Sequence, residues 1–291
     1  MRNTIEYYYD IEVDDLIYKD GKYIFKKYLL VPIVREIDLN LYKYVYSFNR
    51  CNYKIVMNVD KEYVTNIKNI KYILLERINS YTLNIDNILN NSIPLGTKEI
   101  HWDKLWEEKL DYYENYLKSM PCNKLKESFV YYSGLTENAI KFYKEIKKEY
   151  PVFLSHLRLN EMDYLNPINL IVDYRARDVA EYIKLKFFND EVNDIYFNFI
   201  FNNLNEIDIL ILYARLLYPS YYYDCYEKIC NGSEDKCLEI YINKIADYER
   251  LLMDLYFKIK KIINIPKIGW IIKKDLSLDK PIIRPYQMKE D

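Results

Sequence analysis

The sequence has few of the residues that build a metal site. Its 291 residues include only two histidines. The five cysteines are Cys51, Cys122, Cys225, Cys230 and Cys237, and no two of them form a C-x-x-C pair. Because sites for soft metal ions need closely spaced cysteine or histidine ligands, the sequence offers no such spacing. The pattern predicts unpaired thiols in a reducing compartment.

An excess of charge and long apolar runs are also missing. The formal net charge of -2 and the pI near 5.9 give no general attraction to nucleic acid or anionic lipid. No apolar run approaches the roughly 18 residues that a membrane span requires. The first residues, MRNTIEYYYDIEVDD, are too acidic and too polar for a signal peptide. The composition predicts a cytoplasmic protein that neither binds nucleic acid nor spans a membrane.

Tyrosine is abundant, with 34 residues. Asparagine, isoleucine and lysine are also frequent, and A/T-rich codons encode all four residue types. We interpret the excess as a bias of the genome. A tyrosine-dependent role such as oxidative cross-linking is the alternative.

Residues 1–80 are predicted to be rich in β-strands. Short β-prone runs flank Asp20-Gly21, which is a strong hairpin signal. Asp38 is placed to cap a helix after the third strand. The third strand is predicted over 28–31, and later strands over 54–59, 62–67 and 72–78.

Residues 97–291 are predicted to be mainly helical, after a connection over 81–96. The longest helix is expected over 234–262 with Ser233 as its N-cap, and the tail from Ile265 is expected to be loosely attached. The other helices are predicted over 101–118, 136–149, 179–188, 206–217 and 219–230.

The stretch 151–184 gathers the residues that could carry chemistry. A polar segment that starts near His156 precedes the apolar run 170–172, which ends in Asp173. The charged residues Arg175, Arg177 and Asp178 follow and lead into a helix. An apolar strand that delivers a carboxylate to a loop is a common way to build a site.

Five motifs carry a family resemblance. They are W-x3-W-x2-K-x-D-Y over 102–112, GLTENAI over 134–140, SHLRL over 155–159, NLIVDYRARDVAEYIK over 169–184 and LLYPSYYYDCYE over 216–227. With the predicted order of strands and helices, the chain resembles the protein-kinase-like superfamily in its aminoglycoside-phosphotransferase branch. Within that branch it resembles the degenerate spore-coat kinase-like proteins of Firmicutes.

The resemblance implies a two-lobed α+β fold. Residues 1–80 would form an antiparallel β-rich N-lobe, 81–96 a hinge, and 97–291 a helical C-lobe with a degenerate catalytic loop. Active members carry a loop H-x-D-x-x-x-x-N and a second Asp at the end of the next strand. The first Asp acts on the acceptor hydroxyl, and the Asn and second Asp hold Mg²⁺ on the nucleotide.

Alignment on His156 places Arg158 at the catalytic Asp, Asp163 at the Asn and Asp173 at the metal-binding Asp. A guanidinium cannot accept a proton, so Arg158 removes the base. We therefore assign no catalytic residue and keep His156, Arg158 and Asp163 as the catalytic-loop equivalents.

A slipped register of the same loop is the alternative. In that register Glu161 or Asp163 would replace the base, and Asn166 or Asn169 the metal ligand. This alternative requires a loop of unusual shape.

The nucleotide-binding features of the N-lobe are also degenerate. The first hairpin has a single glycine, Gly21, so no glycine-rich loop can cover phosphates. Lys26 or Lys27 could imitate the third-strand lysine, with Lys27 the candidate for cofactor binding. The helix that should supply a partner glutamate has none, since Glu36 precedes it. We interpret both lysines as solvated.

Asp173 is the candidate metal ligand, although one carboxylate alone binds Mg²⁺-nucleotide weakly. The alternative is an ion pair of Asp173 with Arg175 or Arg177. His156 is interpreted as a brace of the loop. Arg215 lies on an otherwise apolar helix and needs a buried partner, for which the candidates are Asp173, Asp178 and Asp224.

The sequence therefore predicts a catalytically inactive kinase-fold protein, a pseudokinase. It would need no cofactor and would act by binding other proteins, with coat proteins as partners in spore coat assembly. The alternative is an active phosphotransferase that uses ATP and Mg²⁺ in a rebuilt site. A third possibility is an unrelated α+β protein whose motifs reflect packing.

Overall fold

The structure is a computed structural model that describes residues 1–276 except Asp20, Val34, 91–92, 118–122, Met162, 192–194 and 233–235. Residues 277–291 lie outside the described part. The chain divides into two compact units. Unit 1 comprises Met1–Asn91 and Leu154–Val172, and unit 2 comprises Ser92–Phe153 and Asp173–Asp291. The loop segment 154–172, which the sequence placed with the helices, thus belongs with the first strands.

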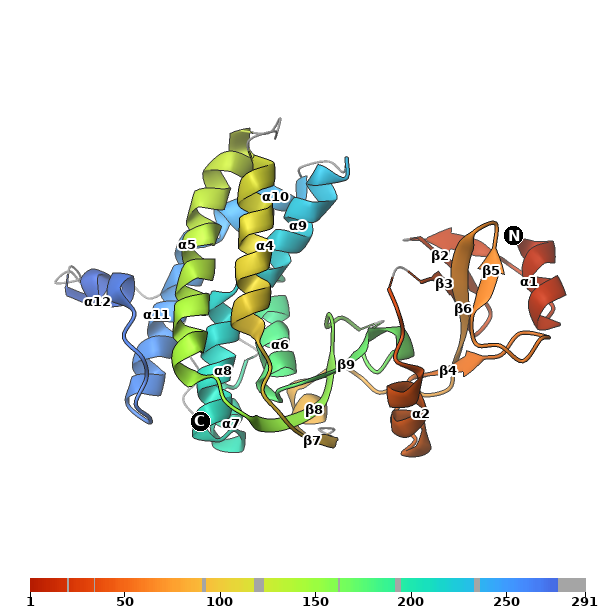
Figure 1. The fold of residues 1–291 in the computed structure, drawn as a ribbon, viewed down its shortest axis with the longest axis horizontal. Helices are drawn as coiled ribbons and strands as arrows, with labels where there is room; N and C mark the ends of the chain where they lie inside the picture. Colours follow the sequence, from red (N-terminus) through yellow and green to blue (C-terminus); the bar gives the residue numbers. More distant parts are fainter. Residues whose placement is uncertain are drawn as a thin grey trace. The chain divides into compact units, whose positions relative to one another are not determined.

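An antiparallel sheet forms the centre of unit 1 (Figure 1). Gly21, with φ of 75°, forms the predicted hairpin turn between the first two strands, and its neighbour Asp20 lies outside the described residues. The predicted third and later strands are confirmed with shifted limits. The strands follow the order β1 (Ile17–Lys19), β2 (Lys22–Phe25), β3 (Tyr28–Pro32), β6 (Ile70–Arg77) and β4 (Tyr53–Val56), and β5 (Thr65–Ile67) also pairs with β6.

Helices α1 (Arg2–Tyr9), α2 (Leu39–Ser47) and α3 (Ile85–Asn90) complete the first part of unit 1. Asp38 caps α2 as predicted, because its carboxylate accepts hydrogen bonds from two backbone N–H groups of the first turn. The sequence did not predict α1. Only Ile5 and Tyr9 of that helix are buried, so its apolar pattern is too short to recognise.

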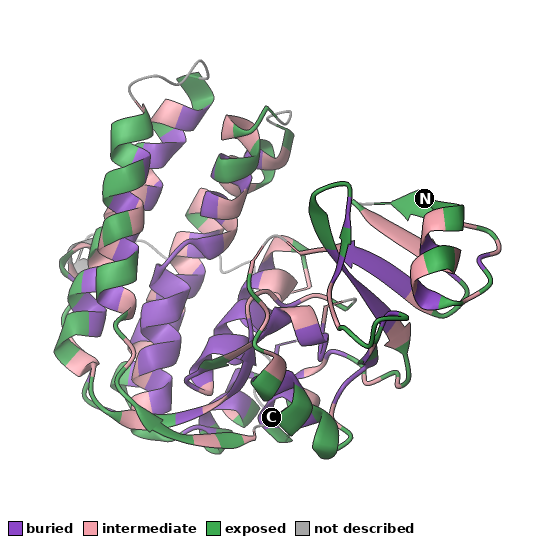
Figure 2. Ribbon diagram, turned by 45° about the vertical axis from the view of Figure 1, so that its right-hand side comes forward, coloured by how far each residue is buried: buried purple, intermediate pink, exposed green. Residues whose placement is uncertain are grey.

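Helix α8 (Glu206–Leu217) lies at the centre of unit 2 and has the predicted limits. It is apolar on almost every side and packs against α5 (Asn123–Ile146) and α6 (Ala176–Phe188), so most of its residues are buried (Figure 2). Asn205 caps it through hydrogen bonds at 3.0 Å. The other helices are α4 (Trp102–Leu117), α7 (Phe197–Asn203), α9 (Ser220–Cys230), α10 (Lys236–Asn243), α11 (Ile245–Lys260) and α12 (Gly269–Leu276).

Three further strands form a second sheet in the order β7 (Pro94–Lys98), β8 (Tyr150–His156) and β9 (Leu170–Asp173). Strand β9 is the predicted apolar run ending in Asp173. The sequence assigned β7 to a connection because it contains proline and glycine. In the described part of the chain, no helix combines the length and apolar character needed to cross a bilayer.

Two helix limits and the attachment of the tail were predicted wrongly. Helix α5 begins at Asn123, ahead of the predicted start at 136, because burial of its first turns outweighs the cost of Gly134, about 1 kcal/mol. The expected helix over 234–262 is two helices, α10 and α11, separated at Lys244; the proposed N-cap Ser233 lies outside the described residues. Ile265 and Ile271 are buried, so this part of the tail packs on the unit.

The predicted set of unpaired thiols is wrong for two cysteines. Cys225 of α9 and Cys237 of α10 form a disulfide with a Cα–Cα distance of 6.2 Å. Cys51 is a free buried thiol, and burial raises its pKa to about 12. Cys230 is also free, and Cys122 lies outside the described residues. The sequence could not reveal the pairing because the two cysteines are twelve residues apart on separate helices.

A pH-dependent stability follows from Asp208 in the first turn of α8. Burial raises the pKa of its carboxyl from 3.8 to about 6, against the lowering effect of Arg175. The native state therefore favours the protonated form, and stability is lost as the pH rises from about 4 to 6. Asp208→Asn should increase the free energy of unfolding at pH 7 by up to about 3 kcal/mol, measured by urea unfolding.

The gain from Asp208→Asn should vanish below about pH 4, where the aspartate is protonated in both states. Glu206→Gln, an exposed position in the same helical turn, is the matched control and should show no such pH-dependent gain. A lower stability of Asp208→Asn at pH 7 would contradict the assignment.

Candidate functional site

Asp173, the candidate metal ligand, is fully buried at the end of β9. Its Oδ1 accepts hydrogen bonds from Trp102 Nε1 at 3.0 Å and from the Tyr174 backbone N–H at 2.7 Å. Its Oδ2 accepts one from Arg177 Nη1 at 2.7 Å, and Arg215 Nη1 lies 3.9 Å away. Both oxygens of the carboxylate are therefore engaged by side chains or backbone of unit 2.

Three helices bring these partners together. Trp102 comes from the start of α4, Arg177 from the first turn of α6 and Arg215 from the last turn of α8. The two guanidinium carbons lie 4.9 Å and 4.7 Å from the Trp102 ring centre. Such cation–π contacts are attractive, most strongly when the groups are desolvated, so they stabilise the arginines in addition to the ion pairs. We call Asp173, Trp102, Arg177 and Arg215 the Asp173 cluster.

A second buried carboxylate extends the Asp173 cluster. Glu181 Oε1 lies 3.6 Å from Arg215 Nη2 and 3.4 Å from Lys184 Nζ, and it accepts a hydrogen bond from Ser220 Oγ at 3.1 Å. The prediction that Arg215 finds a buried carboxylate partner is thus confirmed, with Asp173 and Glu181 as its partners. Arg175, the other arginine considered for Asp173, donates to the backbone carbonyl of Asn203.

These contacts do not fit a magnesium ion on Asp173. Mg²⁺ binds carboxylate oxygens that are free to coordinate and that keep their negative charge. Here two arginines balance the charge, and they would repel a divalent cation. Burial also raises the pKa of Tyr174 and Tyr143 nearby, so neither phenol supplies a base. In the part of the chain that the structure describes, no three acidic, histidine or cysteine side chains converge as metal ligands.

The loop that contains the catalytic-loop equivalents lies in unit 1 and is braced by buried polar side chains. His156 Nε2 accepts a hydrogen bond from the Leu165 backbone N–H at 3.0 Å, so this nitrogen holds the loop. Asn52 precedes β4, and its amide donates to the carbonyls of Tyr81 and Tyr164, each at 3.0 Å. The loop is thereby fixed to the sheet of the same unit.

Asn169 holds the two ends of this loop together. Its Oδ1 accepts from the Arg158 backbone N–H at 3.1 Å, and its Nδ2 donates to the backbone carbonyls of Arg158 and Asp163. Asn166 Oδ1 accepts from the Ile168 backbone N–H and caps the turn η1 (Pro167–Asn169). Both asparagines of the slipped register therefore serve the backbone.

Arg158 is the residue that alignment on His156 places at the catalytic Asp. Its Nη1 donates to the Leu157 carbonyl at 2.8 Å, so its guanidinium stays at the loop. Asp163 accepts hydrogen bonds on one carboxylate oxygen from Asn160 at 2.7 Å, and its other oxygen lies 3.4 Å from Lys22 Nζ. Glu161 is exposed. Asp163 is thus held by Lys22, which follows the turn of the first hairpin.

The hairpin and this loop enclose a pocket of about 290 Å³ within unit 1. Its charged and polar lining includes Lys22, Arg35, Asp163 and Asn169, and aliphatic residues such as Ile168 form the remainder. Arg35 Nη2 donates to the Ile168 carbonyl at 2.9 Å. An ion pair and a hydrogen bond therefore link opposite walls of the pocket.

The two candidate lysines of the N-terminal sheet lie in the turn between β2 and β3. Lys26 has a positive φ of 48° and pairs with Asp14 at 2.7 Å. Lys27 is 58% exposed and pairs with Glu76 of β6 at 2.5 Å. Neither lies within β3, where kinase-like enzymes place their nucleotide-binding lysine.

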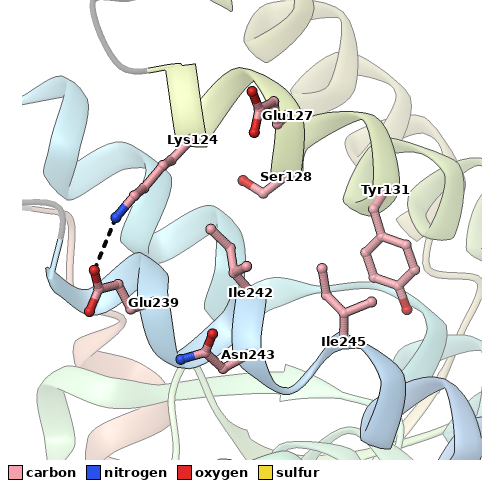
Figure 3. Close-up of a pocket in the computed structure, with 8 residues that line it drawn as sticks. All are labelled: Lys124, Glu127, Ser128, Tyr131, Glu239, Ile242, Asn243 and Ile245. Atoms are coloured by element: carbon pink, nitrogen blue, oxygen red, sulfur yellow. Dashed lines mark hydrogen bonds and ion pairs between the residues drawn. The ribbon is translucent and has the colours of Figure 1, made fainter.

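A second pocket, of about 500 Å³, lies in unit 2 between α5 and α10 (Figure 3). Lys124 of α5 and Glu239 of α10 form an ion pair at 3.1 Å across one end. Tyr131, Ile242 and Ile245 supply its apolar surface. Among the residues that the structure describes, no histidine or cysteine lines this pocket.

Sequence reasoning missed the roles of Asn52 and Trp102. A single asparagine before a strand gives no recognisable signal. Trp102 was considered only as part of the motif over 102–112, and its indole N–H, which needs a partner when buried, was the available clue.

Comparison with known proteins agrees with the predicted resemblance. A family model described as "Spore coat putative kinase YutH" matches residues 3–254. The endospore coat-associated protein YutH of Bacillus subtilis is 23% identical over 209 residues, covering 59% of this chain and 61% of that protein. The match thus spans about three fifths of that relative.

Two solved structures share the fold. An aminoglycoside phosphotransferase from Alicyclobacillus acidocaldarius has a TM-score of 0.54 at 9% identity, covering 90% of this chain and 97% of that one. A spectinomycin phosphotransferase, solved with ADP and spectinomycin, has a TM-score of 0.52 at 12% identity, covering 90% and 98%. The predicted kinase-like fold with an antiparallel N-lobe and helical C-lobe is confirmed, and the alternative of an unrelated fold is wrong.

The family match covers most of the chain, and the motifs that predicted it lie inside the matched residues. The chain belongs to the spore coat putative kinase YutH family.

Proposed function

We propose that this protein is a catalytically inactive member of its family that acts by binding other proteins in the spore coat. The observation that carries the proposal is the Asp173 cluster, in which two buried arginines and an indole N–H engage the carboxylate that would hold Mg²⁺. Arg158 at the position of the base supports the same conclusion. No nucleotide cofactor is required for this function.

The proposed role is consistent with what the relatives are. The family model and the Bacillus subtilis relative are both described by association with the spore coat. We propose synthesis in the cytosol followed by incorporation into the coat, with coat proteins as partners. The pocket between α5 and α10 offers one surface that a partner side chain can enter (Figure 3).

The alternative is a phosphotransferase that uses ATP and Mg²⁺ through Asp163 and Asp173. Asp163 supports it to the extent that its carboxylate borders a pocket. This enzyme would first have to break the Lys22 contact of Asp163 and the arginine contacts of Asp173. The next two predictions distinguish the two functions.

Magnesium-ATP should neither bind nor stabilise the purified protein. A ligand that binds only the native state at 100 times its Kd would stabilise it by about 2.7 kcal/mol. We expect no heat in isothermal titration calorimetry and no change in Tm in a thermal shift assay. Binding heat or transfer of phosphate that Asp173→Ala abolishes would establish the phosphotransferase instead.

Asp173→Ala should lower the free energy of unfolding by about 3 to 5 kcal/mol, because it leaves Arg177 and Arg215 without their shared buried carboxylate. The measurement is urea unfolding of both proteins. Asp111→Ala, at an exposed position of α4, is the control and should change stability by no more than about 0.5 kcal/mol. If the two changes lowered the free energy of unfolding equally, the role of Asp173 would not be structural.

A fluorescent fusion of the protein should form a ring at the coat of developing spores in a spore-forming host. Because the proposed function is independent of phosphate transfer, Asp163→Asn should give the same ring. Fluorescence microscopy during sporulation provides the measurement. Fluorescence spread through the mother cell, with the fusion intact on a gel, would argue against coat binding.

A further inference from the structure

A continuous row of aromatic rings crosses unit 2 from the Asp173 cluster to the surface of α4. Trp106 stacks on Tyr218 at 4.6 Å between ring centres, and Tyr218 lies 5.6 Å from Tyr223. Tyr223 stacks on Tyr113 at 4.7 Å, and Tyr113 lies 5.5 Å from its neighbour Tyr112. We call this row the ring path, and its members in order are Trp102, Trp106, Tyr218, Tyr223, Tyr113, Tyr112 and Tyr116.

The ring path is buried from Trp106 to Tyr113, half-buried at Trp102 and exposed at Tyr112 and Tyr116. Trp106, Tyr223 and Tyr113 are each 1% exposed. At the far end, Tyr112 is 61% exposed and Tyr116 is 43% exposed, and their rings stack at 6.0 Å. Each ring of the path contacts the next one. An electron can therefore pass from ring to ring between the surface and the interior.

The charges along the ring path give it a direction. The guanidinium groups of Arg177 and Arg215 lie over Trp102, and they disfavour the positive charge that an oxidised indole carries. At the opposite end the Tyr113 hydroxyl donates to the carboxylate of Glu227. A phenol loses its proton when it loses an electron, so Glu227 is placed to accept that proton.

The buried tyrosine before Tyr113 lacks such an acceptor. The Tyr223 hydroxyl is hydrogen-bonded to the Thr136 hydroxyl at 2.6 Å, which is no base at neutral pH. Burial raises the pKa of both Tyr223 and Tyr113, so each phenol carries its proton before oxidation. The oxidised state is thus favoured at Tyr113 over Tyr223, and water accepts the proton at the exposed Tyr112.

We propose that the ring path carries one-electron oxidising equivalents from Trp106 to Tyr112 and Tyr116, which makes these two tyrosines an oxidative modification site. The oxidant is an external one-electron oxidant, such as an inorganic radical, which is reduced by one electron when it oxidises the indole. One electron passes from Tyr113 to the oxidised indole across the stacked rings of Tyr218 and Tyr223, which keep their protons. Glu227 takes the Tyr113 proton and returns it when Tyr112 reduces Tyr113.

Oxidised Tyr112 has a defined product. Two phenoxyl radicals from two molecules join through a carbon–carbon bond, and the ring hydrogen at each joined carbon moves to the phenoxyl oxygen. Each tyrosine has then lost one electron and one proton in total. The product is a dityrosine link between two copies of the chain.

Pulse radiolysis of the full chain tests the transfer. Trp270→Phe is used as background, so that Trp102 and Trp106 are the remaining indoles. Azide radicals oxidise indole rapidly, and the absorbance of the tryptophanyl radical should convert into that of the tyrosyl radical. The conversion should be first order and independent of protein concentration, because it occurs within one molecule.

Two variants should slow this conversion by about an order of magnitude or more. Tyr113→Phe removes the oxidisable phenol, and Glu227→Gln removes the proton acceptor without altering a buried ring. Tyr132→Phe is the matched control, since Tyr132 is 2% exposed and stacks on Tyr222 beside the ring path. Circular dichroism checks that all variants are folded.

Peptide mapping after oxidation identifies the end point. Oxidised tyrosine and dityrosine should be found at Tyr112 and Tyr116, and the double variant Tyr112→Phe/Tyr116→Phe should lose the cross-linked dimer. Tyr7→Phe, at a tyrosine that is 74% exposed, should keep the dimer. Equal conversion rates in Tyr113→Phe and Tyr132→Phe, or modification of Tyr7 in place of Tyr112, would overturn the proposal.

Discussion

The burial of one carboxylate determines how unit 2 is organised. Asp173 is fully buried at the end of a strand, and a charge in such a place must be paired and hydrogen-bonded. Trp102, Arg177 and Arg215 meet this requirement from three helices that are far apart in the sequence. The starts of α4 and α6 and the end of α8 are therefore fixed to one point, and the remaining helices pack around them.

The loop of unit 1 takes its shape from hydrogen bonds to its backbone. His156, Asn169 and Asn52 hold the loop through bonds to its backbone, and such bonds are indifferent to the side chains at neighbouring positions. The course of the chain therefore does not depend on which side chain stands at Arg158. The shape of the loop and the side chains that it presents depend on different residues.

Features with strong local causes were predictable from the sequence, including the Gly21 hairpin, the Asp38 cap, α8 and the strand ending in Asp173. The buried partner of Arg215 was also predictable, because a lone charge on an apolar helix has few alternatives. The break at Lys244, the disulfide and the bracing by Asn52 were not. Each depends on contacts between distant segments, which periodicity and propensity do not record.

The disulfide between Cys225 and Cys237 makes the stability of the protein depend on the redox state of its surroundings. Thiols stay reduced in the cytosol, and disulfides form and persist in oxidising surroundings. Closing a loop of this length stabilises the native state by about 3 kcal/mol. In the reduced chain the α9 and α10 region lacks this stabilisation, so it unfolds more readily than in the disulfide-bonded chain.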